Sequence, residues 1–322
     1  MFQRHHHRWR SFRPRRRHHE QYRQRSWRDK RHDKKLIQTP VAVEYVCNNQ
    51  DFFDVAEQRV VSLLQRRPEV NNLDKRIGPL VERFHATKHP LDGVAALLAQ
   101  APRAVLAQIQ MDQYPHGYRN KEKRLFELID FNDTMVDTIL LMDDALRQQF
   151  ADRVKQAADR VCKRVGAPCF SDEQWRAIIR GLTREVAVYL AAVDNGFEAH
   201  ITDRASDALG IDLQIRDPED GRYINIDVKT PSSFRHRMEQ LVHEGRLSEK
   251  QLYEGDRQSY IIEFNGRGTT RTQVIVLCIL PDLFGDLADW RFVNPEPMRL
   301  KLNRIIREHG LNDGRFGIIR SL

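Results

Sequence analysis

Residues 210–230 read GIDLQIRDPEDGRYINIDVKT, and the fold that we predict follows from their pattern. Apolar and polar residues alternate on both sides of a turn signal that contains a proline and a glycine. A period of two on either side of such a turn is typical of a β-hairpin. Each predicted strand has one apolar face. The opposite face carries Asp212 on the first strand and Asp227 with Lys229 on the second.

The polar face of this hairpin resembles the active site of the PD-(D/E)XK nuclease superfamily. The signature of that superfamily is an acidic residue, a variable gap, and then Asp/Glu-x-Lys on the following strand. Asp212 and the triplet Asp227-Val228-Lys229 match it, while Ile211 stands where the proline of the superfamily's name would be. The resemblance covers residues 171–280. It implies an α/β fold with a restriction-endonuclease-like core, an α-β-β-β-α-β arrangement around a mixed sheet.

The resemblance also implies a metal site for the hydrolysis of DNA phosphodiester bonds by an endonuclease, with RNA left open as a substrate. The expected ion is Mg²⁺, for which Mn²⁺ substitutes, because Mg²⁺ prefers one or two carboxylates together with waters and phosphate oxygens. Its expected ligands are Asp212, Asp227, the backbone carbonyl of Val228, and Glu185. Lys229 is expected to stabilise the transition state or to orient the attacking water.

Glu185 lies in a predicted helix that begins after Ser171, whose capping-box partner is Gln174, and that ends near Gly196. Glu185 sits at the edge of the apolar stripe of this helix. In the superfamily, the helix before the core sheet often contributes a glutamate to the metal site, and Glu185 is the matching position. The alternative is a boundary residue that faces solvent or a basic side chain.

The remaining elements of the C-terminal half follow from periodicity. The run VIVLCIL at residues 274–280 is continuously apolar, which predicts a strand buried on both faces. The pattern predicts further strands at 197–202 and 259–264, a helix within 234–254, a closing helix at 297–309, and a short last strand at 316–319.

The chain divides into three predicted parts, which are residues 1–38, 39–168 and 169–322. Residues 39–168 show helical periodicity. Within this region we expect one helix to begin near Pro79, another to be broken around Pro102, and a long one to be interrupted near Asp143.

The N-terminal tail carries the excess positive charge of the chain. Residues 1–35 contain 14 Lys and Arg against three acids, whereas the rest contains 39 against 42. With almost no aliphatic residues, residues 1–38 are predicted to be disordered. Basic blocks bind phosphate backbones, so Arg15, Arg16 and Arg17 are predicted DNA contacts, as are Arg267 and Arg271 in a later basic loop. The alternative for the tail is a solvated extension.

Other functional classes lack support in the sequence. It has no phosphate-binding P-loop, no serine-hydrolase elbow, no zinc-protease motif and no Cys-x-x-Cys pair. No apolar run reaches the length of a membrane span, so we expect a cytoplasmic protein without a membrane partner, which could form a homodimer. Three alternatives remain, namely a nucleic-acid-binding protein that does not cleave, a protein-interaction module, and an ordinary solvent-facing hairpin.

Overall fold

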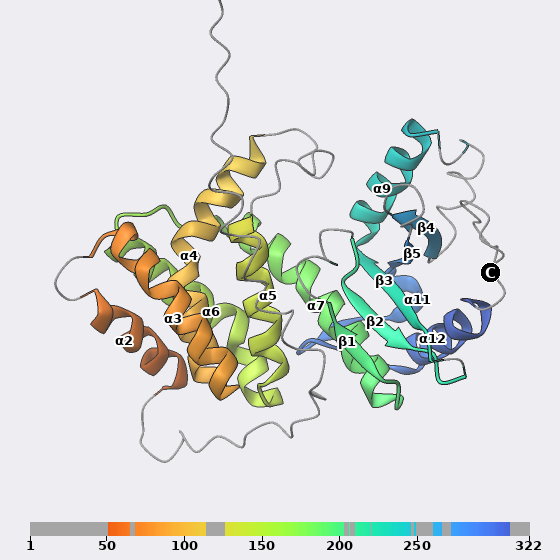
Figure 1. The fold of residues 1–322 in the computed structure, drawn as a ribbon, viewed down its shortest axis with the longest axis horizontal. Helices are drawn as coiled ribbons and strands as arrows, with labels where there is room; N and C mark the ends of the chain where they lie inside the picture. The colour runs from red at the N-terminus through yellow and green to blue at the C-terminus, as the bar shows by residue number, and fades with distance from the viewer. Residues whose placement is uncertain are drawn as a thin grey trace, which may run out of the picture. The chain divides into compact units, whose positions relative to one another are not determined.

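The computed structural model describes residues 51–64, 68–113, 126–202, 206, 210–219, 221–245, 248, 260–265 and 272–309, with backbone alone at 260–265 and 308–309. It is an α/β structure, mostly helical, with a small mixed sheet (Figure 1). Residues 35–322 form one compact unit, so the predicted boundary after residue 168 falls inside that unit. The predictions for the tail, for Arg267 and Arg271, and for the strand at 316–319 lie outside the described residues.

Five helices form the N-terminal part of the described chain: α2 (Phe52–Leu63), α3 (Val70–Thr87), α4 (Pro90–Asp112), α5 (Phe126–Leu140) and α6 (Asp144–Arg164). α4 is the central helix, because it packs against each of the other four. Every residue of α4 from 90 to 102 is buried. A helix that is apolar and buried all round belongs to the core of a domain, and here the four neighbours cover it.

The predicted helix start near Pro79 and the predicted break around Pro102 are both wrong. Pro79 lies inside α3 and Pro102 lies inside α4, and both helices continue past them. A proline within a helix loses one hydrogen bond and costs about 3 kcal/mol. The burial of α3 and α4 against their neighbours outweighs that cost. The predicted interruption near Asp143 is confirmed, since Asp143 caps α6 by accepting a hydrogen bond from the Leu146 amide at 2.9 Å.

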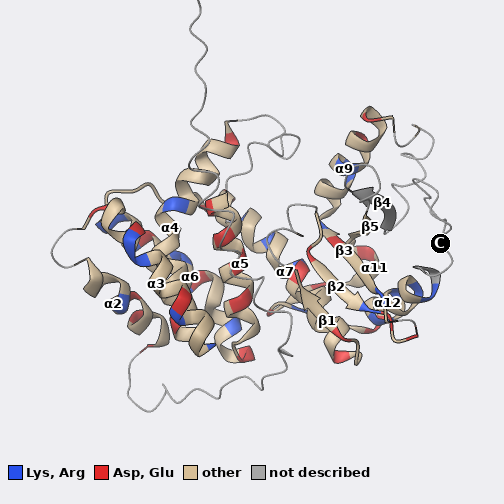
Figure 2. Ribbon diagram, viewed as in Figure 1, with Lys and Arg blue, Asp and Glu red and all other residues tan. Residues whose placement is uncertain are grey.

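A buried carboxylate joins three of these helices. Asp92, in the first turn of α4, is 4% exposed and accepts hydrogen bonds from Arg59 of α2, from Arg83 of α3 at 2.9 Å and from Thr87 at 2.8 Å. One residue further, a Cβ on Gly93 would lie 2.4 Å from the Thr138 hydroxyl, so only glycine allows α4 to approach α5 this closely. Elsewhere, basic and acidic residues are interspersed along the described helices (Figure 2).

The sheet has five strands in the order β1-β2-β3-β5-β4. The strands β1 (Ala199–Ile201), β2 (Leu213–Arg216) and β3 (Tyr223–Lys229) are antiparallel, which confirms the predicted hairpin. After helix α9 (Pro231–His243), the chain continues through β4 (Tyr260–Asn265) to β5 (Thr272–Cys278). β5 pairs parallel with β3 and antiparallel with β4.

β5 is the buried strand that the apolar run predicts. The residues from Val274 to Cys278 are all buried. On one face of the sheet, Ile275 and Leu277 join the main core, which includes helix α7 (Asp172–Asp194). On the other face, Val276 and Cys278 pack against α9. α9 therefore covers the face of β5 that points away from the main core.

α7 begins at the predicted capping box. The Ser171 side chain accepts a hydrogen bond from the Gln174 amide at 3.1 Å, and the Gln174 side chain accepts one from the Ser171 amide at 2.8 Å. Replacing Ser171 by alanine removes the first of these bonds, so we expect a loss of about 1 kcal/mol in the free energy of unfolding. Ser171→Gly is the control and should cost a few tenths of that, because glycine is tolerated at this position. Urea denaturation measures both, and equal effects would contradict the capping role.

The C-terminal described elements are helix α11 (Pro281–Phe284), the short strands β6 (Leu287–Ala288) and β7 (Arg291–Phe292), and helix α12 (Glu296–His309). β6 and β7 form a hairpin whose two turn residues, Asp289 and Trp290, have positive φ angles of 50° and 67°. Trp290 is 4% exposed and its indole N–H donates to the carbonyl of Arg147 in α6 at 3.1 Å. The hairpin thus joins the C-terminal part of the chain to the N-terminal helices. None of the described helices is long and apolar enough to cross a membrane.

Candidate active site

The two faces of the hairpin differ as its sequence predicts. The apolar side chains of both strands are buried in the main core with α7, and they are Leu213, Ile215, Ile224 and Ile226. Asp227 and Lys229 lie on the other face of β3, because side chains alternate along a strand. The same face is covered by α9 at β5, so the polar residues of β3 lie beside α9.

Asp212 lies directly before β2 and is held opposite the end of β3. Its amide donates to the carbonyl of Ile226 at 2.9 Å, and its carbonyl accepts from the Thr202 amide at 3.1 Å. The Asp212 carboxylate accepts a hydrogen bond from the amide of Val228 at 2.7 Å. This bond holds the Asp212 carboxylate in place through the backbone of the Asp-x-Lys triplet.

Asp227 and Lys229 form an ion pair within the same triplet. The Lys229 ammonium also lies 4.0 Å from the Asp212 carboxylate, so it contacts both acids. Asp227 is 5% exposed. Its burial raises the pKa of the Asp227 carboxyl well above the usual range. Lys229 opposes that rise in pKa. The negative charge of Asp212 adds to the rise, and so does the hydrogen bond that the protonated Asp227 carboxyl donates to Asp212. Two carboxylates and one ammonium leave an excess of negative charge when both acids are ionised.

These groups fit the donor set of a hard divalent cation. Both carboxylates offer oxygen, and the amide of Val228 points toward Asp212. Since the N–H and C=O of a strand residue point to the same side, the Val228 carbonyl is directed to the edge where Asp212 lies. Mg²⁺ is bound by one or two carboxylates and keeps several waters, so the two aspartates and this carbonyl would suffice.

Glu185 is not brought together with the two aspartates. It is half-buried on α7, the helix that packs on the apolar face of β2 and β3. Among the described residues, no three His, Cys, Asp or Glu side chains form a group that could hold a metal ion. The predicted third carboxylate ligand therefore has no support in the described part of the chain.

The amides beside the aspartates bond to one another. Gln214 and Asn225 are paired across β2 and β3, and the Gln214 side chain donates to that of Asn225 at 2.7 Å. The Asn225 side chain donates in turn to the carbonyl of Gln273 at 2.9 Å. These two residues form an uncharged row next to the carboxylate pair. The predicted DNA contacts Arg15, Arg16, Arg17, Arg267 and Arg271 lie outside the described residues.

A group of exposed side chains on the same face was not anticipated from the sequence. His200 of β1 and Tyr223 of β3 reach toward each other across β2, with their ring centroids 5.9 Å apart. Beside them, Arg216 donates to the Glu198 carboxylate at 3.0 Å. The alternation that places Asp227 on this face also places Tyr223 there, four residues earlier, so extending it would have found Tyr223. Predicting His200 would have required the register in which β1 pairs with β2.

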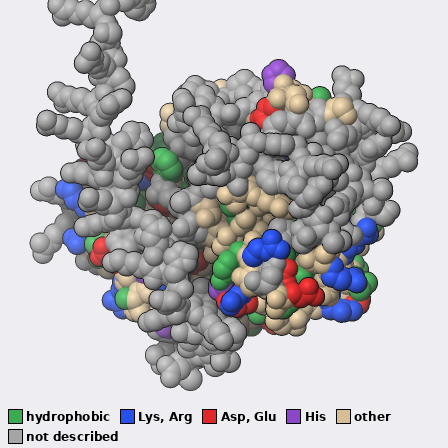
Figure 3. All heavy atoms as spheres, turned by 45° about the vertical axis from the view of Figure 1, so that its right-hand side comes forward, with side chains coloured by type: hydrophobic (Ala, Val, Ile, Leu, Met, Phe, Trp, Pro, Cys, Tyr) green, Lys and Arg blue, Asp and Glu red, His purple; other side chains and the backbone are tan. Residues whose placement is uncertain are grey.

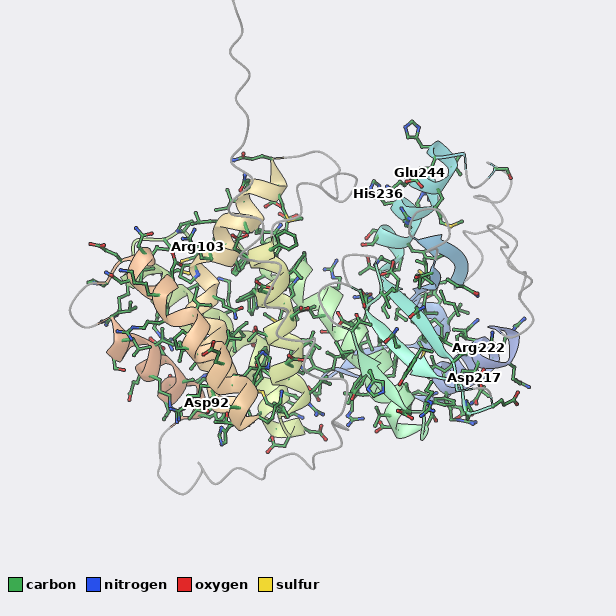
Figure 4. All side chains as sticks on the ribbon, in the orientation of Figure 1. Asp92, Arg103, Asp217, Arg222, His236 and Glu244 are labelled. Atoms are coloured by element: carbon green, nitrogen blue, oxygen red, sulfur yellow. The ribbon has the colours of Figure 1, made fainter. Side chains whose placement is uncertain are left out.

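The described surface around the sheet carries no single sign of charge. Figure 3 shows Lys and Arg side chains next to Asp and Glu side chains. Figure 4 shows Asp217 and Arg222 at the turn end of the hairpin, whereas Asp92 and Arg103 belong to the N-terminal helices. Comparison with protein-family models, with curated proteins and with solved structures finds no match. The superfamily resemblance thus rests on the residues and their arrangement alone.

Proposed function

We propose that the protein is a metal-dependent nuclease that hydrolyses DNA phosphodiester bonds, as an endonuclease with a restriction-endonuclease-like core. The observation that carries the proposal is the cluster formed by Asp212, Asp227 and Lys229. A buried carboxylate, a second carboxylate fixed by backbone, and a lysine that contacts both lie together at the end of β3, the middle strand of a mixed sheet. The order of elements supports the same proposal: α7, three antiparallel strands, α9, and then β4 and β5, of which β5 runs parallel to β3.

In this proposal each group has a separate task. Asp212, Asp227 and the Val228 carbonyl would hold Mg²⁺, which would supply a more acidic bound water and neutralise charge on the phosphate. The amide of Val228 keeps the Asp212 carboxylate in place. Lys229, attached to the same strand as Asp227, offers a positive charge to the phosphate oxygens in the transition state. Its contact with both acids positions its ammonium before substrate binds.

The test is cleavage of supercoiled plasmid and of single-stranded DNA by the full chain, in Mg²⁺ or Mn²⁺ and in EDTA. We expect cleavage with either metal, none in EDTA, and a loss of more than about 100-fold in the rate for Lys229→Ala, because a preorganised charge is removed. The matched control is Lys155→Ala, since Lys155 is likewise ion-paired but lies in α6. It should retain the wild-type rate.

A protein that binds nucleic acid without cleaving it would behave differently. In that case the wild type and Lys229→Ala would bind DNA equally well, and neither would cleave it with any metal. That result would overturn the proposed nuclease function and favour a binding protein. Equal rates of cleavage by wild type and Lys229→Ala would likewise show that the cluster takes no part in the reaction.

A further inference from the structure

The face of the sheet that carries Asp227 continues beyond the carboxylate pair as an exposed surface. Tyr223 is 45% exposed, and the side chain of His200 is 42% exposed. At β5 the same face is covered, because Val276 and Cys278 pack against Phe234 and other apolar residues of α9. The sheet therefore changes along one face from a covered apolar part to an exposed polar and aromatic part, and Asp227 lies where the two meet.

We propose that this exposed face binds single-stranded DNA, with Tyr223 and His200 stacking on unpaired bases next to the cleavage site. The inference rests on the proposed nuclease function, whose substrate it specifies. Tyr223 precedes Asp227 by four residues on the same strand, which places it about 13 Å away along β3. A bound polynucleotide would span that distance, with one of its phosphates at the carboxylate pair and a nearby base at Tyr223.

The chemistry of the face favours bases over phosphates. Between the carboxylates and the aromatic pair lie Gln214 and Asn225, whose amides are neutral and already aligned by a hydrogen bond of 2.7 Å. The exposed Arg216 is paired with Glu198, so it adds little net positive charge. A neutral row that ends in two exposed rings suits a base, which presents a π-face and polar edges.

The same features select an unpaired strand. Aromatic side chains stack on bases only where the bases are unstacked, as in single strands, loops and ends. In a duplex the base faces are covered by their neighbours, and the protein would meet mostly phosphates. Arg216 beside the two rings is paired with Glu198, so it offers those phosphates little net positive charge.

The test is binding of fluorescein-labelled oligo(dT) and of a duplex of equal length to the full chain in EDTA, where metal-dependent cleavage is stopped. We expect Tyr223→Ala to weaken binding of the single strand by about tenfold to a hundredfold, and that of the duplex less than threefold. Tyr223→Phe should bind as wild type. The matched control is Phe126→Ala, an aromatic residue of α5 that is 44% exposed, and it should leave both affinities unchanged.

Salt separates stacking from contacts to phosphates. Measured at about 50 mM and about 200 mM salt, the ratio of wild-type to Tyr223→Ala affinity should stay constant, because counterion release affects both proteins equally. Unchanged binding by Tyr223→Ala overturns this inference, and so does an equal loss for single strand and duplex. If wild type nevertheless cleaves DNA with metal, the nuclease function stands. If Tyr223→Ala loses single-strand binding but no metal supports cleavage, the binding face stands and the nuclease function falls.

Discussion

Replacing Asp227 by asparagine is expected to abolish metal-dependent cleavage while leaving the protein folded. Asparagine has the size of aspartate but carries no charge, so it cannot hold a cation in the same way. We expect the rate to fall by more than about 100-fold, as happens when a preorganised electrostatic group is removed. Plasmid cleavage in Mg²⁺ measures the loss.

The same substitution should change how stability depends on pH. Burial raises the pKa of the Asp227 carboxyl in the folded protein, whereas in the unfolded chain the pKa of this carboxyl is about 4. Between these two values the folded protein binds more protons than the unfolded chain, so its stability falls as pH rises. Relative to Asp227→Asn, the wild type should therefore lose stability as pH rises from about 4, and the difference should level off above the folded pKa.

A metal supplies a second readout for Asp227. A cation that binds only the folded state raises the melting temperature. Mg²⁺ should therefore stabilise the wild type but not Asp227→Asn. The matched control is Asp217→Asn, because Asp217 is also 5% exposed, lies on the same hairpin and accepts a hydrogen bond from the Glu219 amide at 2.8 Å. It should keep cleavage and the response to Mg²⁺. If both variants lost cleavage and the response to Mg²⁺ equally, the two buried carboxylates would be needed for the stability of the hairpin and not for binding the metal.

Replacing Trp290 by alanine is expected to cost about 3–5 kcal/mol of the free energy of unfolding, which is the usual range for removal of a buried aromatic side chain. The indole ring packs edge-on against Phe150 with centroids 5.9 Å apart, and its N–H bonds to the carbonyl of Arg147. Both partners lie in α6, and Arg147 itself is 4% exposed. The substitution thus opens a cavity at the contact between the β6–β7 hairpin and α6.

Trp290→Phe is the graded control for this prediction. Phenylalanine keeps an aromatic ring against Phe150 but loses the hydrogen bond, so the expected cost is about 1–2 kcal/mol. Urea denaturation of both variants checks the order of the two effects. A loss below about 1 kcal/mol for Trp290→Ala would show that the hairpin contributes little to the stability of the helices.

Local periodicity predicted the hairpin, the buried strand and the start of α7 well, since each depends on neighbouring residues. The β6–β7 hairpin has no such signal. Its turn uses Asp289 and Trp290 at positive φ, where Asn-Gly or Asp-Gly is the usual pair. Packing of the indole against α6 stabilises this turn, and no pattern within residues 287–292 indicates that contact.

The same limit applies to the candidate site and to the buried charges. Asp212, Asp227 and Lys229 were predictable because a period of two places them on one side of adjacent strands. The position of Glu185 relative to the two aspartates depends on how α7 packs on the sheet, and this is a tertiary property. Asp92 gives a parallel case, since its partners Arg59 and Arg83 come from two other helices and share no local spacing with it.

The burial of the first half of α4, residues 90–102, provides a measure of global stability for the other variants. Amides in a helix covered on all sides exchange with deuterium through opening of the whole molecule, whereas loops and helix ends exchange by local fluctuation. The slow amides of residues 91–101 should thus report global stability directly. A variant such as Lys229→Ala that loses cleavage while these amides stay protected has lost its chemistry, and one that loses both has lost its fold.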